Sequence, residues 1–260
     1  MIHPIDNLVS IITPSYNSQQ FIGQMIDSIL AQTYTNWELL IADDCSTDNS
    51  CSIIKSYTDK DNRIKLFRLN VNSGAGVARN ESIKHARGRY IAFCDSDDWW
   101  SPDKLQVQID FMKKNQVQMS YSSYYTCDEE NSIMGMVVSY KKISYKHIIK
   151  DDSIGFLTCI YDTKDIGKVY MPSIRRRQDW ALKIMLLQKC STAYGVINPL
   201  AYYRIREGSL SNNKFKLVRY NVQVYKDILN YSTFRAWVFF IFVFFPNYIL
   251  KKIRLRIINL

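Results

Sequence analysis

The sequence has few histidines, and its cysteines, glycines and prolines form no metal-binding motif or repeat. It contains three histidines, and its six cysteines form no Cys-x-x-Cys pair, so a zinc site is not expected. Cysteines scattered in this way indicate free thiols in a reducing compartment. Nine glycines and six prolines without a repeat exclude a collagen-like chain. No basic stretch followed by an apolar run opens the chain, so we also expect no signal peptide.

The composition is that of a folded protein. The chain has 260 residues, of which 47% are hydrophobic and 22% are charged, and these values exclude a disordered chain and a multispan membrane protein. A chain of this length can bury a large core without disulfides. We therefore expect one large domain.

The net charge of +10 is distributed unevenly along the chain. Residues 1–130 carry 12 Lys and Arg against 17 Asp and Glu, whereas residues 131–260 carry 22 against 7. A nucleic-acid-binding protein could have such a basic second half. Near the C-terminus, however, the basic residues accompany a block of Phe, Trp and Ile, and this mixture fits a membrane surface better.

Strands and helices alternate in the first half, which predicts a mostly parallel sheet flanked by helices. Short β-branched or apolar runs and helical spacing of apolar residues mark these elements. Strands are expected at 8–13, 37–42, 64–69 and 90–94, with helices at 20–32, about 46–57, 74–87 and about 102–115. Ser46 and Thr47 offer N-caps for the second helix. The second half is less regular, with strands expected at 117–126, 133–140 and 155–161, a helix at 179–189, one or two strands at 192–205 and a helix at about 214–229.

The last apolar segment, residues 234–250, reads FRAWVFFIFVFFPNYIL. As a helix its 17 residues would span about 25 Å, less than the hydrocarbon core of a bilayer at about 30 Å. Pro246 and Asn247 interrupt the run. We expect an interfacial helix with Lys251, Lys252, Arg254 and Arg256 near lipid phosphates. The alternative is a buried helix that packs on the domain.

Acidic residues follow two of the predicted strands. Asp43 and Asp44 follow the second strand, and Asp95, Asp97 and Asp98 follow the fourth. Neighbouring parallel strands would bring both groups to one edge of the sheet, where ligands bind in such folds. Carboxylates this close repel one another unless a cation such as Mg²⁺ or Mn²⁺ compensates. Because Asp is also common at helix caps and turns, spacing alone leaves the two interpretations open.

Several segments, taken in order, resemble the family 2 glycosyltransferases. They are IITPSYN (11–17), ADDCSTDNS (42–50), NSGAGVARN (72–80), YIAFCDSDDWWSPDKL (90–105), RRRQDWALK (175–183) and PLAYYRIREGSLSNNK (199–214). The resemblance extends from about residue 8 to about residue 215 and implies an α/β fold of the GT-A type, the nucleotide-diphospho-sugar transferase fold, with C-terminal helices. We expect a transferase domain at 1–213, with a nucleotide-binding half at 1–100 and an acceptor half at 101–213. A membrane-associating helical segment would follow at 214–260.

The resemblance implies roles for residues on the nucleotide side. Pro14 and Tyr16 match a segment that lines the nucleotide, and Tyr16 could stack on a base or be a half-buried turn residue. Asp44 matches a residue that accepts a hydrogen bond from uracil, whose N3–H is a donor. Arg79 matches an arginine near the base and diphosphate. Asp95 opens the DxD triplet and would face the ribose or the metal.

The remaining matches concern the metal and the acceptor. Asp97 would ligate a Mn²⁺ or Mg²⁺ ion that neutralises charge on the leaving UDP. Asp179 matches the catalytic base, and the three arginines at 175–177 should keep it ionised. Trp99 would wall the donor sugar. Many relatives have His, which in some binds metal, where Arg206 stands here; we therefore expect Arg204 or Arg206 to bind the diphosphate instead.

The predicted function is that of an inverting, metal-dependent glycosyltransferase that uses a UDP-sugar. The acceptor implied is a lipid-linked saccharide in O-antigen, capsule or related polysaccharide synthesis, with the enzyme cytoplasmic and peripherally attached to the inner face of a bacterial membrane. No nucleic-acid partner is expected. The alternatives are a non-catalytic basic protein that binds membranes or nucleic acid, and a sugar nucleotidyltransferase. The latter would need a glycine-rich basic loop after the first strand, where this chain has TPSYNS.

Overall fold

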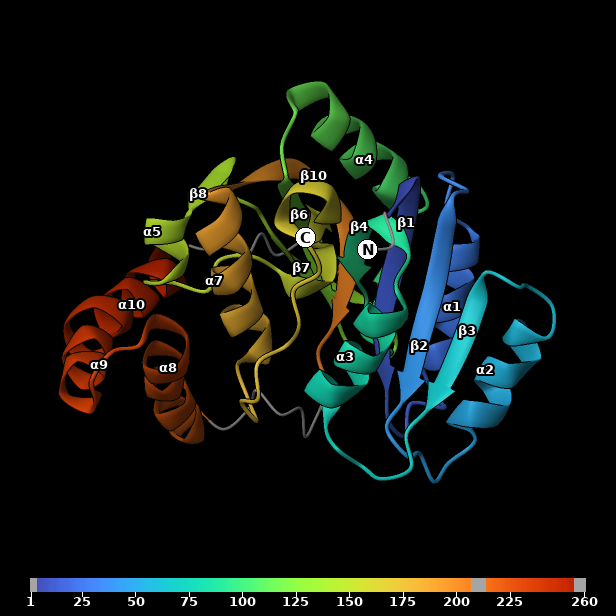
Figure 1. Cartoon of the computed structure of the whole chain (residues 1–260), viewed down its shortest axis with the longest axis horizontal. Coiled ribbons are helices and arrows are strands. Elements are labelled where there is room, and N and C mark those ends of the chain that lie inside the picture. Colours follow the sequence, from blue (N-terminus) through green and yellow to red (C-terminus); the bar gives the residue numbers. More distant parts are fainter. Residues whose placement is uncertain (1–3, 207–213, 255–260) are drawn as a thin grey trace.

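The computed structural model describes residues 4–206 and 214–254. The first half alternates strands and helices as the sequence predicts (Figure 1). Its elements are β1 (Ile5–Ser15), α1 (Ile22–Leu30), β2 (Trp37–Asp43), α2 (Ser50–Thr58), β3 (Ile64–Arg68), α3 (Ala75–His85), β4 (Gly88–Phe93), β5 (Trp99–Trp100) and α4 (Lys104–Asn115). The strands β1 to β4 are parallel, and all of β2 is buried because helices cover both faces of this part of the sheet.

The second half completes the same sheet and adds the C-terminal helices. Its elements are β6 (Met119–Cys127), β7 (Ile133–Val137), β8 (Lys142–Ser144), α5 (Tyr145–Ile148), the 3₁₀ turn η1 (Phe156–Thr158), β9 (Ile160–Asp162), α6 (Thr163–Ile166), α7 (Gln178–Cys190), β10 (Thr192–Arg204), α8 (Lys214–Leu229), α9 (Thr233–Phe239), the π-helical turn η2 (Phe240–Phe244) and α10 (Phe245–Arg254). The strand order is β3-β2-β1-β4-β9-β6-β10-β5, with β7 beside β6 and β8 beside β10. The short β9 is antiparallel to both β4 and β6 and joins the two halves of the sheet.

Two buried clusters lie on the two faces of the sheet. One combines β1 and β2 with apolar residues of α1 and α4, such as Ile26 and Ile109. The other includes Ile83 of α3 and continues through α7 to the C-terminal helices. Figure 1 shows α8, α9 and α10 gathered beside α7, at the opposite end of the molecule from α2.

The structure corrects several details of the predicted elements. α2 begins at Ser50 rather than after Ser46, because the Ser46 hydroxyl donates to Asp43 at 2.5 Å and its oxygen accepts from the Asn17 main-chain N–H. Residues 192–205 give one strand, β10, with register shifts near Pro199. The strand expected at 155–161 is a 3₁₀ turn followed by three residues of β9.

The C-terminal apolar segment is helical throughout its described length. Pro246 interrupts the apolar run but not the helical path, since it lies in the first turn of α10, directly after the π-helical turn η2. A proline lacks an N–H donor, and a π turn is one of the local adjustments that accommodate such a gap. Within residues 4–206 and 214–254, no helix is both long and apolar enough to cross a bilayer.

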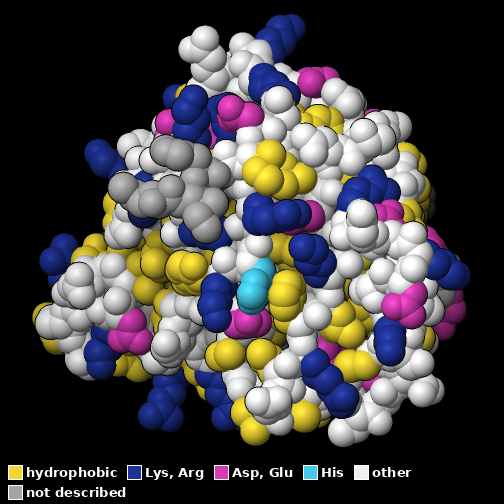
Figure 2. Space-filling view, turned by 45° about the vertical axis from the view of Figure 1, so that its right-hand side comes forward, with side chains coloured by type: hydrophobic (Ala, Val, Ile, Leu, Met, Phe, Trp, Pro, Cys, Tyr) yellow, Lys and Arg dark blue, Asp and Glu magenta, His cyan; other side chains and the backbone are white. Residues whose placement is uncertain are grey.

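One face of this segment packs on the domain and the other is exposed. Phe240 and Phe244 are buried, and the Phe244 ring lies 5.1 Å from that of Trp180 in α7. The opposite face exposes large apolar side chains, namely Phe234, Trp237, Val238, Ile241, Phe242, Phe245 and Ile249. We call these seven residues the exposed C-terminal face. Figure 2 shows hydrophobic side chains among basic ones on the left of the molecule, the side where Figure 1 places α8 to α10.

Candidate active site

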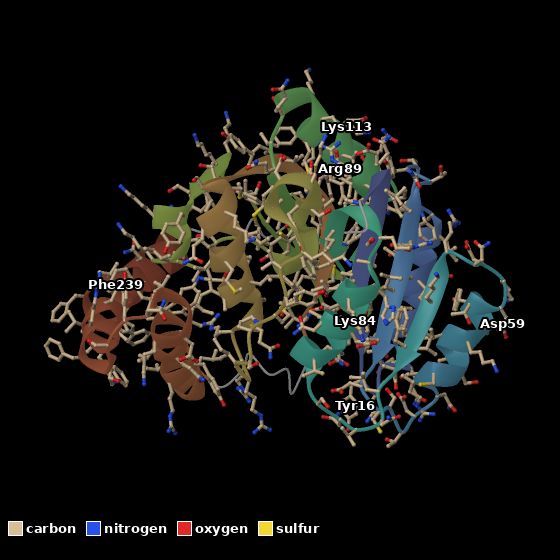
Figure 3. The ribbon with its side chains drawn as sticks, in the orientation of Figure 1. Tyr16, Asp59, Lys84, Arg89, Lys113 and Phe239 are labelled. Atoms are coloured by element: carbon tan, nitrogen blue, oxygen red, sulfur yellow. The ribbon has the colours of Figure 1, made fainter. Side chains whose placement is uncertain are left out.

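The predicted nucleotide-side residues lie at the carboxyl ends of β1, β2 and β4. β1 lies between the other two strands, so the two acidic groups flank β1 and do not follow neighbouring strands as the sequence suggested. Pro14 is in register with Ala42 of β2 at this edge. Tyr16 follows β1, is 50% exposed, and lies at the same edge in Figure 3. An exposed aromatic ring is thus available beside the buried carboxylates.

Asp44 holds the loop that precedes α3. Its two carboxylate oxygens accept the main-chain N–H groups of Ser73 and Gly74, each at 2.7 Å. Gly74 has a φ of +92°, a conformation that glycine adopts without strain. Asp44 is almost fully buried, yet an ionised carboxylate can accept about four hydrogen bonds, so it retains capacity for a further donor.

Arg79 pairs with the first aspartate of the DxD triplet. Its Nη2 lies 2.6 Å from Asp95 Oδ1, and the guanidinium carbon lies 5.1 Å from the centre of the Phe156 ring. Arg79 is 8% exposed, and its Nε has no hydrogen-bond partner among the described residues. The sequence left open a surface cation at this position; the structure shows a buried arginine with donor capacity to spare beside a carboxylate.

The other two aspartates of this loop differ in their surroundings. Asp97 Oδ2 lies 2.7 Å from Arg206 Nη2. Burial and the charge of Asp95 raise the pKa of Asp97, and Arg206 opposes that shift. Asp98 is 2% exposed and accepts the Arg204 main-chain N–H at 2.9 Å, while burial followed by the charges of Asp97 and Asp95 raises its pKa. Burial, more than the neighbouring carboxylates, therefore disfavours the ionised forms of Asp97 and Asp98.

Arg204 is a structural residue in this arrangement. It is 3% exposed, and its guanidinium donates to the main-chain oxygens of Asp97 and Glu129 and to Gln24 Oε1. These contacts hold the DxD loop against β10 and occupy the groups that a diphosphate would use. Of the two arginines proposed for the diphosphate, Arg206 has the more exposed side chain, at 38%.

Of the two tryptophans that follow Asp98, Trp100 is buried in the core and Trp99 is partly exposed. Trp100 is buried, and its Nε1 donates to the Leu157 main-chain oxygen at 3.0 Å. Trp99 stacks on Tyr202 of β10 with ring centres 5.0 Å apart and an interplanar angle of 3°. Trp99 is therefore the tryptophan whose ring remains near the loop surface.

Asp179 occupies the first turn of α7, and its side chain is 36% exposed. Arg177, which has a φ of 64°, precedes the helix as its N-cap. Burial would raise the pKa of Asp179, but Lys183, Arg177, the Trp180 main-chain N–H and Arg79 together lower it below its usual value. Asp179 is thus held ionised, by Lys183 more than by the arginines named from sequence.

The N-terminal turns of α3 and α7 touch at Gly76. A Cβ atom on Gly76 would overlap the side-chain amide of Gln178, so glycine lets this amide lie against α3. Gln178 directly precedes Asp179. The contact places Asp179 beside α3, whose Arg79 pairs with Asp95 on the other side.

Sequence reasoning missed Lys183 and Asp152. Lys183 Nζ lies 2.6 Å from Asp152 Oδ1 and 3.4 Å from Asp179 Oδ2. The spacing of four residues between Asp179 and Lys183 was a signal, since such pairs share a helix face. Nothing in the sequence marked Asp152. Within residues 4–206 and 214–254, the DxD loop included, no group of three or more His, Cys, Asp or Glu side chains is arranged to hold a metal ion.

Comparison with known proteins agrees with this architecture. The model of the family described as "Glycosyl transferase family 2" matches residues 10–178, which is more than half of the chain. The chain therefore belongs to glycosyltransferase family 2 and is a glycosyltransferase. The matched region contains the donor-side residues and ends one residue before Asp179.

Two bacterial relatives match most of the chain. One is TuaG of Bacillus subtilis, a glycosyltransferase whose name provisionally assigns it to teichuronic acid biosynthesis; it is 40% identical over 89% of this chain and 93% of its own length. The other is WfgD of Escherichia coli, a UDP-Glc:alpha-D-GlcNAc-diphosphoundecaprenol beta-1,3-glucosyltransferase, 39% identical over 86% of this chain and 87% of its own.

Two solved structures show the fold. Staphylococcus aureus TarS 1-349 in complex with UDP-GlcNAc has a TM-score of 0.71 and 21% identity, and covers 94% of this chain and 75% of that one. The mannosyltransferase PcManGT from Pyrobaculum calidifontis, in complex with GDP-Man and Mn²⁺, has a TM-score of 0.67 and 15% identity, and covers 89% and 69%. The predicted GT-A fold, with a mostly parallel sheet and C-terminal helices, is confirmed.

Proposed function

We propose that this glycosyltransferase moves a sugar from a UDP-sugar to a hydroxyl of a lipid-linked saccharide, with inversion at the transferred carbon. The observation that carries the proposal is the position of Arg79. It pairs with Asp95 on the nucleotide side and contributes to the ionisation of Asp179 on the acceptor side. A donor seated on the DxD loop would therefore lie within reach of a carboxylate base.

On the nucleotide side, Asp44 and Tyr16 provide complementary contacts for uracil. The Asp44 carboxylate can accept the N3–H of the base while it keeps its two main-chain donors. The exposed Tyr16 ring offers a surface on which the base can stack. The complex of TarS with UDP-GlcNAc supports a UDP-sugar as donor.

The acidic loop fits a divalent cation. Burial removes water from around the Asp97 carboxylate and Asp95 adds a negative charge beside it, so the pKa of Asp97 is raised, and a bound cation would stabilise its ionised form. Carboxylate oxygens together with diphosphate oxygens are the ligands that Mg²⁺ and Mn²⁺ prefer. Asp97 would hold the ion, with Asp95 beside it; when bound, the ion offsets the negative charge that develops on departing UDP. Arg206, paired with Asp97, supplies further positive charge at the same place.

On the acceptor side, Asp179 serves as the general base. A hydroxyl is a poor nucleophile until it loses its proton, and a carboxylate that stays ionised can take that proton as the hydroxyl attacks. Lys183 and Arg177 keep Asp179 in the ionised form. A single base opposite the leaving UDP gives one displacement, which inverts the configuration.

The exposed C-terminal face supports a lipid-linked acceptor and attachment to the inner face of the cytoplasmic membrane. Seven large apolar side chains lie along α9, η2 and α10, and α10 ends in the basic sequence at 251–254. Apolar residues beside basic ones favour an interface with anionic lipid. The name of WfgD, which acts on a diphosphoundecaprenol-linked sugar, points to the same class of acceptor in polysaccharide synthesis.

Titration calorimetry with UDP tests the nucleotide site without knowledge of the sugar or acceptor. We expect saturable binding with Mn²⁺, loss of at least tenfold in affinity with chelator, and a similar loss in Asp97→Asn. Asp103→Asn is the matched control, since Asp103 is exposed, lies after β5 and caps α4 without a side-chain hydrogen bond. Failure to bind UDP in the presence of Mn²⁺ would contradict the proposal.

A further inference from the structure

Lys183 is buried between two carboxylates, one turn of α7 after Asp179. It is 1% exposed, and its Nζ donates to the Ile154 main-chain oxygen at 2.8 Å. The same Nζ lies 2.6 Å from Asp152 Oδ1 and 3.4 Å from Asp179 Oδ2. An ammonium group has three N–H donors, and here each has an oxygen within reach. A buried cation is retained only where its surroundings compensate it in this way.

The two carboxylates beside Lys183 are not equivalent. The side chain of Asp152 is 16% exposed and also lies 3.7 Å from Arg177 Nη1, whereas that of Asp179 is 36% exposed. Asp152 is the inner partner, with the shorter distance to Nζ. Asp179 is the outer partner, and it is the one that solvent or an acceptor can reach. Lys183 itself is too buried to contact a substrate.

Charged groups from several elements face Asp179. Lys183 lies on the same helix as Asp179, and Arg177 lies on the turn before that helix. Arg79 lies on α3, and Asp152 lies on the loop before η1. Among the groups that lower the pKa of Asp179, Lys183 makes the largest contribution, followed by Arg177. Asp152 adds a negative charge, but it lies nearest to the ammonium group and anchors it.

We propose that Lys183 is a positioning residue for glycosyl transfer, which holds the Asp179 carboxylate in place and ionised while Asp152 fixes Lys183. The inference rests on the proposed role of Asp179 as the base. It gives the pair Asp152–Lys183 a role beside that of Arg177, which also lies close to Asp152.

The ionisation of Asp179 can be measured directly, without substrate. We suggest carbon-13 NMR titration of the full-length protein with labelled aspartate carboxyls, with the Asp179 signal identified by its loss in Asp179→Asn. In the wild type, the signal stays in its ionised position down to about pH 4, since its pKa lies below the usual value of about 3.8. In the double variant Lys183→Met, Asp152→Asn, we expect the midpoint to rise by one pH unit or more.

The double variant removes one positive and one negative charge, so that neither is left unpaired in the interior. If it does not fold, as judged by circular dichroism, Lys183→Gln keeps a hydrogen-bond donor without the charge and should raise the midpoint in the same direction. Asp152→Asn alone retains the ammonium group and should not raise it. A midpoint that stays at the wild-type position when the charge of Lys183 is removed overturns the proposal.

A second measurement separates this inference from the proposed function. In the wild type, kcat for sugar transfer should be constant from about pH 5 to pH 7, whereas in Lys183→Gln it should fall about tenfold for each pH unit below the raised pKa. KM for the UDP-sugar should change little. If the wild type transfers sugar and the decrease of kcat at low pH occurs at the same pH in Lys183→Gln, the result counts only against the role proposed for Lys183. If the Asp179 midpoint rises in the variant but the wild-type enzyme transfers no sugar, the result counts against the proposed function instead.

Discussion

Arg206 Nη2 lies 2.7 Å from Asp97 Oδ2, so an arginine contacts the carboxylate that the family resemblance assigns to the metal. By the family resemblance, a histidine that binds metal in some members would be expected in place of Arg206. An arginine cannot ligate a cation, but its charge opposes the rise in the pKa of Asp97 that burial and Asp95 cause. In this chain the side chain at position 206 therefore contributes its own positive charge to Asp97 instead of a metal ligand.

The close contact between Gly76 and the Gln178 side chain predicts a measurable effect of a small substitution. In Gly76→Ala, the new methyl group would overlap the side-chain amide of Gln178, which is the end of a flexible side chain and would have to turn away from α3. Because the main chain of α7 need not move, we expect a loss of kcat for sugar transfer of a few-fold, well below the about 100-fold that a displacement of about 1 Å can cost.

A second substitution and a control distinguish this effect from loss of stability. Gln178→Ala removes the overlapping atoms, so the double variant with Gly76→Ala should recover part of the kcat lost in Gly76→Ala. Gly23→Ala in α1 is the control, because its Cβ would meet only Tyr57 Oη at an ordinary 3.6 Å. Equal losses in the single and the double variant would contradict the explanation.

Lys104 is expected to destabilise the folded state at neutral pH. It is fully buried, its Nζ has no hydrogen-bond partner among the described residues, and it lies 3.9 Å from the centre of the Trp100 ring. Burial lowers the pKa of Lys104 to about 7. Between this value and the usual 10.5 the unfolded chain binds a proton that the folded chain does not, so this group makes stability rise with pH.

Urea unfolding of Lys104→Met measures this effect. We expect the variant to be more stable than the wild type at pH 6.5, by several kcal/mol at most, since each pKa unit corresponds to about 1.4 kcal/mol. At pH 9.5 the difference in unfolding free energy should be smaller. Lys113→Met is the matched control, because Lys113 is exposed on the same helix (Figure 3) and its removal should change little. A variant less stable than the wild type at both pH values would contradict this reasoning.

The exposed C-terminal face predicts which residues hold the protein on lipid. Phe234 and Phe242 are 81% and 74% exposed. Burial of one such ring in a bilayer interface is worth about 1.5–3 kcal/mol, so Phe234→Ser with Phe242→Ser should weaken binding to phosphatidylglycerol vesicles by at least tenfold in a sedimentation assay. Ile133→Ser with Met134→Ser removes exposed apolar residues from β7 and should leave vesicle binding unchanged. Vesicle binding that does not depend on Phe234 and Phe242 would argue against this face.

The sequence predicted the parts of the fold that have strong local signals. Periodic apolar residues located the helices and strands of the first half, and α8 spans the expected residues. β9 was not predicted as the link between the halves, since three residues carry no periodicity and their pairing with β4 and β6 is set by tertiary contacts. The buried face of the C-terminal helices could not be predicted from the sequence, because it is defined by packing against Trp180 in another helix.

The candidate site was predictable where it is carried by motifs. Asp44, Asp95 and Asp97 lie at one edge of the sheet as expected, although their roles remain proposals. Arg204 was proposed for the diphosphate, and its main-chain partners could not be inferred from sequence because they lie far along the chain. The pairing of Lys183 with Asp152 was hidden for the same reason: 31 residues separate the two, and Asp152 lies in a loop.

The central claim is that Asp179 is the base of a sugar transfer from a UDP-sugar, and Asp179→Asn tests it most directly. Transfer and UDP affinity should be measured together on the wild type and this variant. Loss of a base costs about 100- to 10,000-fold in rate. We predict a loss of transfer of that order with UDP affinity unchanged within a few-fold. Transfer that survives the substitution, or loss of UDP binding together with transfer, would contradict the role assigned to Asp179.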